Sequence, residues 1–122
     1  MKALKIKTDF TSEVVEITAE PLYMAMAGEI GCEFVEYCKL HWLPEAGHLA
    51  IVCDDEFLLK GKPVLNINAS ILYGAGEHGQ PLCGDCLIVR EKHTPDGIET
   101  VSLTDDDIQM IYDALPATLM HE

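Results

Sequence analysis

The stretch HLAIVCDDEFLLKGKPVLNINASILY, residues 48–73, decides how the rest of this chain is expected to fold. Its first part, His48–Cys53, is an apolar run that is rich in β-branched residues and too short for a typical helix. Such a run predicts a strand that is buried on both faces and therefore lies inside a sheet. After an acidic turn and a basic turn, Asn66 is well placed to cap a short helix with its side-chain oxygen.

Further strands are predicted on both sides of this central stretch. Lys2–Lys7 alternates apolar and polar residues, and Val14–Thr18 follows a polar turn, a pattern that is typical of a hairpin. Cys32–Leu40 predicts a third strand, with apolar residues on both of its faces. A second hairpin is predicted from Cys86–Lys92 and Ile98–Ser102, because the turn sequence TPDG separates them.

Helices are predicted at both ends of the chain. Pro21 suits the first turn of a short helix that would end at Gly28. Near the C-terminus, Thr104 followed three residues later by Asp107 resembles a capping box. The helix that it opens carries one apolar stripe, which consists of Ile108, Ile111, Tyr112 and Leu115.

These elements predict an α+β fold. We expect a mostly antiparallel sheet of about five to seven strands, with two or three short helices packed on one side. A chain of 122 residues is of ordinary size for one domain, so residues 1–122 are expected to form a single globular unit.

The charge of the chain is strongly negative, because 21 Asp and Glu residues stand against 8 Lys and Arg residues, for a formal net charge of -13. A field of this sign repels the phosphate backbone of DNA or RNA and the anionic surface of a membrane. We therefore expect no direct nucleic-acid binding and no membrane binding. The expected partner is a neutral or basic protein, whose identity the sequence leaves open together with the oligomeric state.

The cysteines and the N-terminal segment indicate the compartment. The 5 cysteines are an odd number, and the opening MKALKIKTDF lacks the apolar core of a secretory signal. Both features indicate a reducing cytosol, so we expect a cytoplasmic protein. No apolar run approaches the roughly 20 residues that span a bilayer. No cofactor is expected.

One arrangement has the residue types of a metal site. Cys83 and Cys86 form a CxxC pair, His78 precedes the pair, and His93 is a candidate fourth ligand. Zinc favours four thiolate or imidazole ligands, but the spacing from His78 to Cys83 is not that of a zinc finger. A redox pair would precede a helix, whereas this one opens a predicted strand. We therefore predict no metal at Cys83 and Cys86, and we assign no catalytic residue.

Two other patterns imitate known binding sites in the wrong context. Gly74, Gly76 and Gly79 match the dinucleotide pattern G-x-G-x-x-G, but they follow a predicted helix instead of leaving a strand and opening a helix. The acidic run Asp54–Glu56 lacks the ligand spacing of an EF-hand loop. The sequence therefore predicts a helix stop and a solvated turn at these places.

Six segments, in this order, resemble a family of small bacterial proteins that are borne by phages, plasmids and other mobile elements and are catalogued as a domain of unknown function. The segments are MKALKIKTD, EFVEY, HLAIVCDDE, NINASILY, GDCLIVR and SLTDDDI. The resemblance covers most of the chain and implies family-pattern residues of unknown role, namely Asn66, Ala69, Ser70, Leu72, Tyr73, Gly84 and Asp85. At Cys83 and Cys86 the family pattern has apolar residues, which argues further against zinc there. The family has no established activity that the resemblance would imply.

Three functional hypotheses follow. The first is a small acidic cytosolic domain that acts as a non-catalytic accessory or regulatory protein-interaction module, since the sequence contains no readable nucleophile–base pairing. The second is an acidic decoy that imitates DNA and inhibits a host DNA-binding protein. The third is an enzyme or zinc-binding protein that uses His78, Cys83 and Cys86. Carboxylates gathered on one face would favour the decoy, whereas scattered carboxylates would favour the interaction module.

Overall fold

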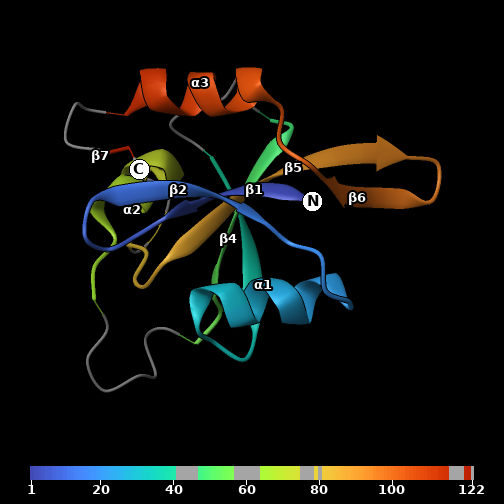
Figure 1. The fold of residues 1–122 in the computed structure, drawn as a ribbon, viewed down its shortest axis with the longest axis horizontal. Helices are drawn as coiled ribbons and strands as arrows, with labels where there is room; N and C mark the ends of the chain where they lie inside the picture. Colours follow the sequence, from blue (N-terminus) through green and yellow to red (C-terminus); the bar gives the residue numbers. More distant parts are fainter. Residues whose placement is uncertain (41–46, 57–63, 75–78, 80, 116–119, 122) are drawn as a thin grey trace.

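The computed structural model describes residues 1–40, 47–56, 64–74, 79, 81–115 and 120–121. Within these ranges, one 7-stranded sheet packs against the helices α1, α2 and α3, which confirms an α+β fold (Figure 1). In the described part of the chain, no helix is long and apolar enough to cross a membrane.

The sheet is mostly antiparallel, as predicted. The strand order is β3-β4-β5-β1-β2-β7, and β6 pairs with the C-terminal half of β5. The described pairs are antiparallel except that of β2 with β7, which is parallel. The strands are β1 (Lys2–Ile6), β2 (Thr11–Glu16), β3 (Val35–Lys39), β4 (Leu49–Asp54), β5 (Cys86–Thr94), β6 (Gly97–Val101) and β7 (Met120–His121).

β4 is the interior strand that the apolar run predicted. It is buried along its whole length and pairs with β3 on one side and with β5 on the other. Because side chains alternate along a strand, Leu49, Ile51 and Cys53 enter one apolar cluster, while Ala50 and Val52 enter another. This burial on both faces explains why the run shows no alternation of apolar and polar residues.

Both predicted hairpins are confirmed. β1 pairs with β2 so that Lys5 lies opposite Glu13 and Lys2 lies opposite Glu16. β5 and β6 form the second hairpin, which projects to one side of the molecule (Figure 1). Cross-strand pairs of opposite charge contribute roughly 0.2–1 kcal/mol each, so they favour the register more than they stabilise the fold.

The helices are α1 (Leu22–Ile30), α2 (Ile67–Tyr73) and α3 (Asp105–Ala114). α2 and α3 cover one face of the sheet and α1 covers the other, as Figure 1 shows with α3 above the sheet and α1 below it. The position of α1 therefore differs from the prediction that the helices pack on one side of the sheet, which α2 and α3 follow. The physical reason lies in the sheet, because its interior strands present apolar residues on both faces and each such face needs a cover.

Capping residues set the boundaries of the helices. The side chain of Asn66 accepts a backbone N–H at the start of α2, and Thr104 and Asp107 form the predicted capping box of α3. The predicted end of α1 at Gly28 is wrong, because the helix continues to a left-handed Gly31 with φ 76°. A glycine inside a helix costs some stability but does not end it, whereas a left-handed position favours a residue without Cβ.

Candidate functional site

The predicted CxxC motif lies at the start of β5, far from its candidate fourth ligand. Cys83 is half-buried opposite Leu65, and Cys86 is buried at the first position of β5. His93 is exposed near the other end of the same strand, about 23 Å from Cys86 at the rise of an extended chain. His93 therefore cannot share a metal ion with Cys86, and His78 lies outside the described residues.

The two CxxC thiols also lack the setting of a reactive pair. Burial raises the pKa of the Cys83 thiol and, together with the nearby Asp85 carboxylate, that of the Cys86 thiol. A reactive thiol needs the opposite, a lowered pKa beside a helix N-terminus or a cation. Cys86 instead donates its S–H to the carbonyl oxygen of Gly84 at 3.6 Å. Cys86 is a buried part of the strand entrance, and Cys83 is a half-buried one.

Asn66, one of the family-pattern residues, is buried and uses its side chain to hold backbone groups. Its amide nitrogen donates to the carbonyl oxygens of Ile6 and Gly84, both at 2.9 Å, and its oxygen accepts the N–H of Ala69 at 3.1 Å. One side chain thereby joins β1, the loop before β5 and the start of α2. Since each bond satisfies a backbone group in or near the core, the fold itself requires this asparagine.

The other polar family-pattern residues hold the same loop. The hydroxyl of Ser70 accepts the N–H of Leu82 at 2.9 Å. The N–H of Gly84 donates to the carbonyl oxygen of Val64 at 2.8 Å. The carboxylate of Asp85 accepts the N–H of Thr8 at 3.1 Å. These contacts connect the loop before β5 to α2 and to the turn after β1.

The remaining family-pattern residues lie in α2 and face the core. Ala69 and Leu72 are buried between the helix and the sheet, and Tyr73 packs against the same cluster. Beside them, Asn68 is buried although neither of its amide atoms has a hydrogen-bond partner among the residues that the structure describes, a state that costs stability. Packing and backbone hydrogen bonds thus give each family-pattern residue a structural role.

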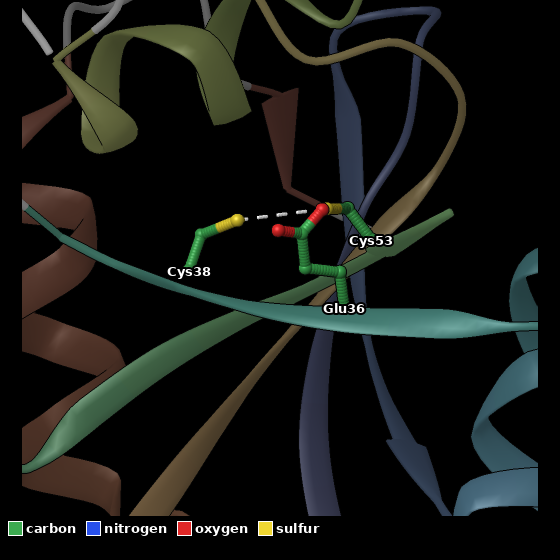
Figure 2. Close-up of side chains that lie close together, drawn as sticks. All are labelled: Glu36, Cys38 and Cys53. Atoms are coloured by element: carbon green, nitrogen blue, oxygen red, sulfur yellow. Dashed lines mark hydrogen bonds between the residues drawn. The ribbon is translucent and has the colours of Figure 1, made fainter. Parts of the chain in front are cut away.

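Sequence reasoning missed a cluster of three side chains on β3 and β4, namely Glu36, Cys38 and Cys53. Glu36 lies directly opposite Cys53 in the strand register, and Cys38 follows two residues later on the same face of β3. The Sγ atoms of the two cysteines are 3.7 Å apart, and the three candidate ligand atoms all lie within 4.8 Å of one another. Figure 2 shows the carboxylate and both thiols pointing toward one another. The E-x-C spacing was visible in the sequence, but its partner on β4 was not.

The two thiols of this cluster differ in acidity. The pKa of Cys53, which is fully buried, is raised by its hydrogen bond to Cys38 and by burial. The same hydrogen bond lowers the pKa of Cys38, which is only partly buried. Cys38 is therefore the more acidic of the two thiols. Tyr73, whose pKa is raised by burial and by these acidic groups, lies close to the cluster at the end of α2.

Asp107 forms a second polar centre, between α3 and the sheet. Its carboxylate accepts two hydrogen bonds from Arg90 Nη1, at 2.8 and 2.9 Å, and one from His48 Nε2 at 2.9 Å. Burial acts to raise the pKa of Asp107, but the bonds from Thr104, Arg90 and His48 outweigh it and hold the pKa at about 2. We interpret this ionised, hydrogen-bonded carboxylate as the anchor that fixes α3 to β4 and β5.

β3 forms one end of the sheet in the described part of the chain, with β4 as its strand neighbour. The carbonyl oxygen of Phe34 accepts a hydrogen bond from the β4 side at 3.0 Å, so the alternation of the ladder directs the backbone groups of Val35, Tyr37 and Lys39 away from β4. The side chains of Phe34 and Tyr37 are 59% and 42% exposed. We call residues 34–39 the β3 edge.

Carboxylates lie on both sides of the sheet. Glu29 on α1 pairs with Lys5 at 3.2 Å, whereas Asp105 at the start of α3 pairs with Lys2 at 2.8 Å. α1 and α3 cover opposite faces of the sheet (Figure 1), so these two carboxylates belong to opposite sides of the molecule. The negative charge is therefore not confined to one face.

Comparison with known proteins gives one match. Residues 1–116 match the family described as Domain of unknown function (DUF3846). No curated protein and no solved structure matches the chain. The match covers nearly the whole chain and brings no activity with it, so any functional inference depends on the geometry of the residues themselves.

Proposed function

The chain belongs to the DUF3846 family, and we propose that it is a non-catalytic accessory or regulatory module that binds a partner protein in the bacterial cytoplasm. The proposed binding surface is the β3 edge, which receives an extended, basic segment of the partner as an added strand. The odd number of cysteines, 5, supports a reducing compartment. The observation that carries the proposal is a strand edge with outward backbone groups flanked by exposed aromatic side chains.

The backbone of β3 supplies the first part of the argument. The N–H and C=O groups of Val35, Tyr37 and Lys39 point away from β4 by the alternation of the ladder. Backbone groups in this position hydrogen-bond to an added strand, which provides affinity without a preformed pocket. Three outward residues match a short peptide segment of about five residues.

The side chains at this edge supply the second part. Phe34 and Tyr37 project on opposite faces of the strand because their positions differ by an odd number. Both are exposed, and aromatic side chains are enriched among the residues that dominate binding energies at protein interfaces. An added strand would contact one aromatic side chain on each of its faces.

Charge decides which partner fits. The chain has a formal net charge of -13, and both Glu36 on the β3 edge and Glu33 just before it are exposed. A second copy of the same acidic chain is repelled, and charged edge strands are a known means of preventing self-association. A basic segment is attracted, and its binding should weaken as salt screens the charges.

The proposal is tested by selecting short peptides from a random library on the immobilised reduced protein. We expect peptides that alternate Lys or Arg with β-branched or aromatic residues. Amide resonances of Val35, Tyr37 and Lys39 should shift most on titration with a selected peptide. The double variant Phe34→Ala/Tyr37→Ala should bind at least about tenfold more weakly, since interface aromatics contribute about 2 kcal/mol or more when they are hot spots.

The matched control is Val14→Ala/Ile98→Ala, which removes two equally exposed apolar side chains from β2 and β6. This variant should bind the selected peptides with unchanged affinity. Selection of acidic or sequence-random peptides would contradict the proposal, as would resonance shifts centred on another surface.

A further inference from the structure

We propose that Glu36, Cys38 and Cys53 form a zinc-binding site on the α2 side of the β3–β4 pair (Figure 2). The site uses neither cysteine of the CxxC motif, although the buried Cys86 lies in the same core cluster as Cys53. It does not depend on the proposed binding of a peptide at the β3 edge. Two thiolates and one carboxylate from adjacent strands would hold the ion, and the fourth position would remain open to solvent.

The distance between the two sulfurs is the first argument. Zinc binds thiolates at about 2.3 Å in tetrahedral geometry, which places two sulfur ligands about 3.8 Å apart. The Sγ atoms of Cys38 and Cys53 are 3.7 Å apart. A disulfide would require about 2.05 Å. The sulfurs thus already stand at the spacing of two ligands of one zinc ion.

The strand register is the second argument. Residues that face each other in an antiparallel pair have side chains on the same side, and so do residues two apart on one strand. Glu36 faces Cys53, and Cys38 is two residues from Glu36, so the register fixes all three on one face. Binding of the ion should therefore cost little conformational entropy, because the β3–β4 ladder already fixes the backbone of each ligand residue.

Accessibility and shape are the third argument. Cys53 is fully buried in β4, Cys38 is partly buried, and Glu36 is exposed. The buried sulfur provides a fixed anchor, and the ion enters from the side of the exposed carboxylate. The three ligand atoms lie within 4.8 Å of one another, so a rotamer adjustment of Glu36 suffices to bring an oxygen to about 2.0–2.2 Å from the ion.

The proton balance is straightforward. Binding of Zn²⁺ forms two Zn–S bonds and one Zn–O bond, and the two thiol protons leave to the buffer because only thiolates are ligands. The formal net charge of -13 favours a divalent cation at the surface of the protein.

The test uses the full-length reduced protein freed of metal by chelation. Titration with Zn²⁺ against a chromophoric chelator should give one ion per chain, and Co²⁺ should give thiolate-to-metal charge transfer together with the visible bands of a tetrahedral ion. Cys38→Ser and Cys53→Ser should abolish both signals. Glu36→Gln should weaken Zn²⁺ binding by about tenfold or more, while the charge-transfer band persists because both sulfurs remain.

Cys32→Ser and Cys83→Ser are the matched controls, because both replace a partly buried thiol outside the cluster. Both variants should retain full metal binding. The proposal is overturned if the native protein binds no Zn²⁺ with its thiols reduced, or if Cys38→Ser binds it as well as the native protein does. Loss of binding in Cys83→Ser would overturn it too, because the metal would then lie at the CxxC motif. Because Cys53→Ser alters a core position, Cys38→Ser serves as the decisive variant.

Discussion

At the scale of single residues, Asn66 joins three segments of the chain through one buried amide. Replacement by alanine would leave the carbonyl oxygens of Ile6 and Gly84 and the N–H of Ala69 without this partner. Each unsatisfied buried group costs about 1–3 kcal/mol. We expect Asn66→Ala to lower the free energy of unfolding by about 3 kcal/mol or more, measured by urea denaturation.

The control for this variant is Ile67→Ala, because Ile67 is the next residue and is 41% exposed. Its effect should be well below 1 kcal/mol, as for most exposed positions outside special contacts. Equal effects of the two substitutions would show that the amide network contributes little to stability.

Residue-level prediction from the sequence succeeded where the contact is local. The capping box of Thr104 and Asp107 spans three residues and was predicted from that spacing. The contacts of Asp107 with His48 and Arg90 were not predicted, since they join residues 59 and 17 positions away. The contact between Cys38 and Cys53 was not predicted for the same reason, because it depends on the register of two strands.

At the scale of elements, α3 is the helix whose packing the sequence described best. Ile111 is fully buried in the cluster under the helix, and Ile108 and Tyr112 are partly buried against it, which confirms the predicted stripe. Truncation of a buried isoleucine to alanine costs about 2–5 kcal/mol. We expect Ile111→Ala to lower the denaturation midpoint strongly, whereas Asp106→Ala, at an exposed position, should leave it nearly unchanged.

This comparison is made with circular dichroism during urea denaturation of both variants and the native protein. Similar small shifts for Ile111→Ala and Asp106→Ala would show that α3 is not docked on the sheet in solution. A large shift for Asp106→Ala would instead indicate a contact that the buried stripe does not explain.

α1 shows why the side on which a helix packs was harder to predict. Its sequence LYMAMAGEI is apolar around most of the helix, so no single stripe indicates the buried side. In the structure Met26 and Ala27 are buried, while Tyr23 and Met24 are more than half exposed. The strands were predicted more reliably, because period-two alternation and turn residues are local signals.

At the scale of the whole molecule, composition predicted the sign of the electrostatic field but not its shape. The helix stop that the sequence predicted after α2 is confirmed, because Gly74 ends the helix in the left-handed conformation with φ 82°. The placement of carboxylates depends on which helix covers which face. The composition alone therefore left the choice between the interaction module and the DNA-mimicking decoy open.

A decoy must present its carboxylates as one elongated surface, since only a contiguous acidic face reproduces the field that a basic DNA-binding cleft recognises. Here Glu29 and Asp105 lie on opposite sides of the sheet, and both are already paired with lysines. Asp107 is buried in its own ion pair with Arg90. We therefore expect that the protein does not compete with duplex DNA for bacterial restriction or repair enzymes in electrophoretic mobility assays at low salt. Competition at micromolar protein concentration that weakens as ionic strength rises would instead favour the decoy over the interaction module. A true mimic shares the salt dependence of the DNA that it replaces.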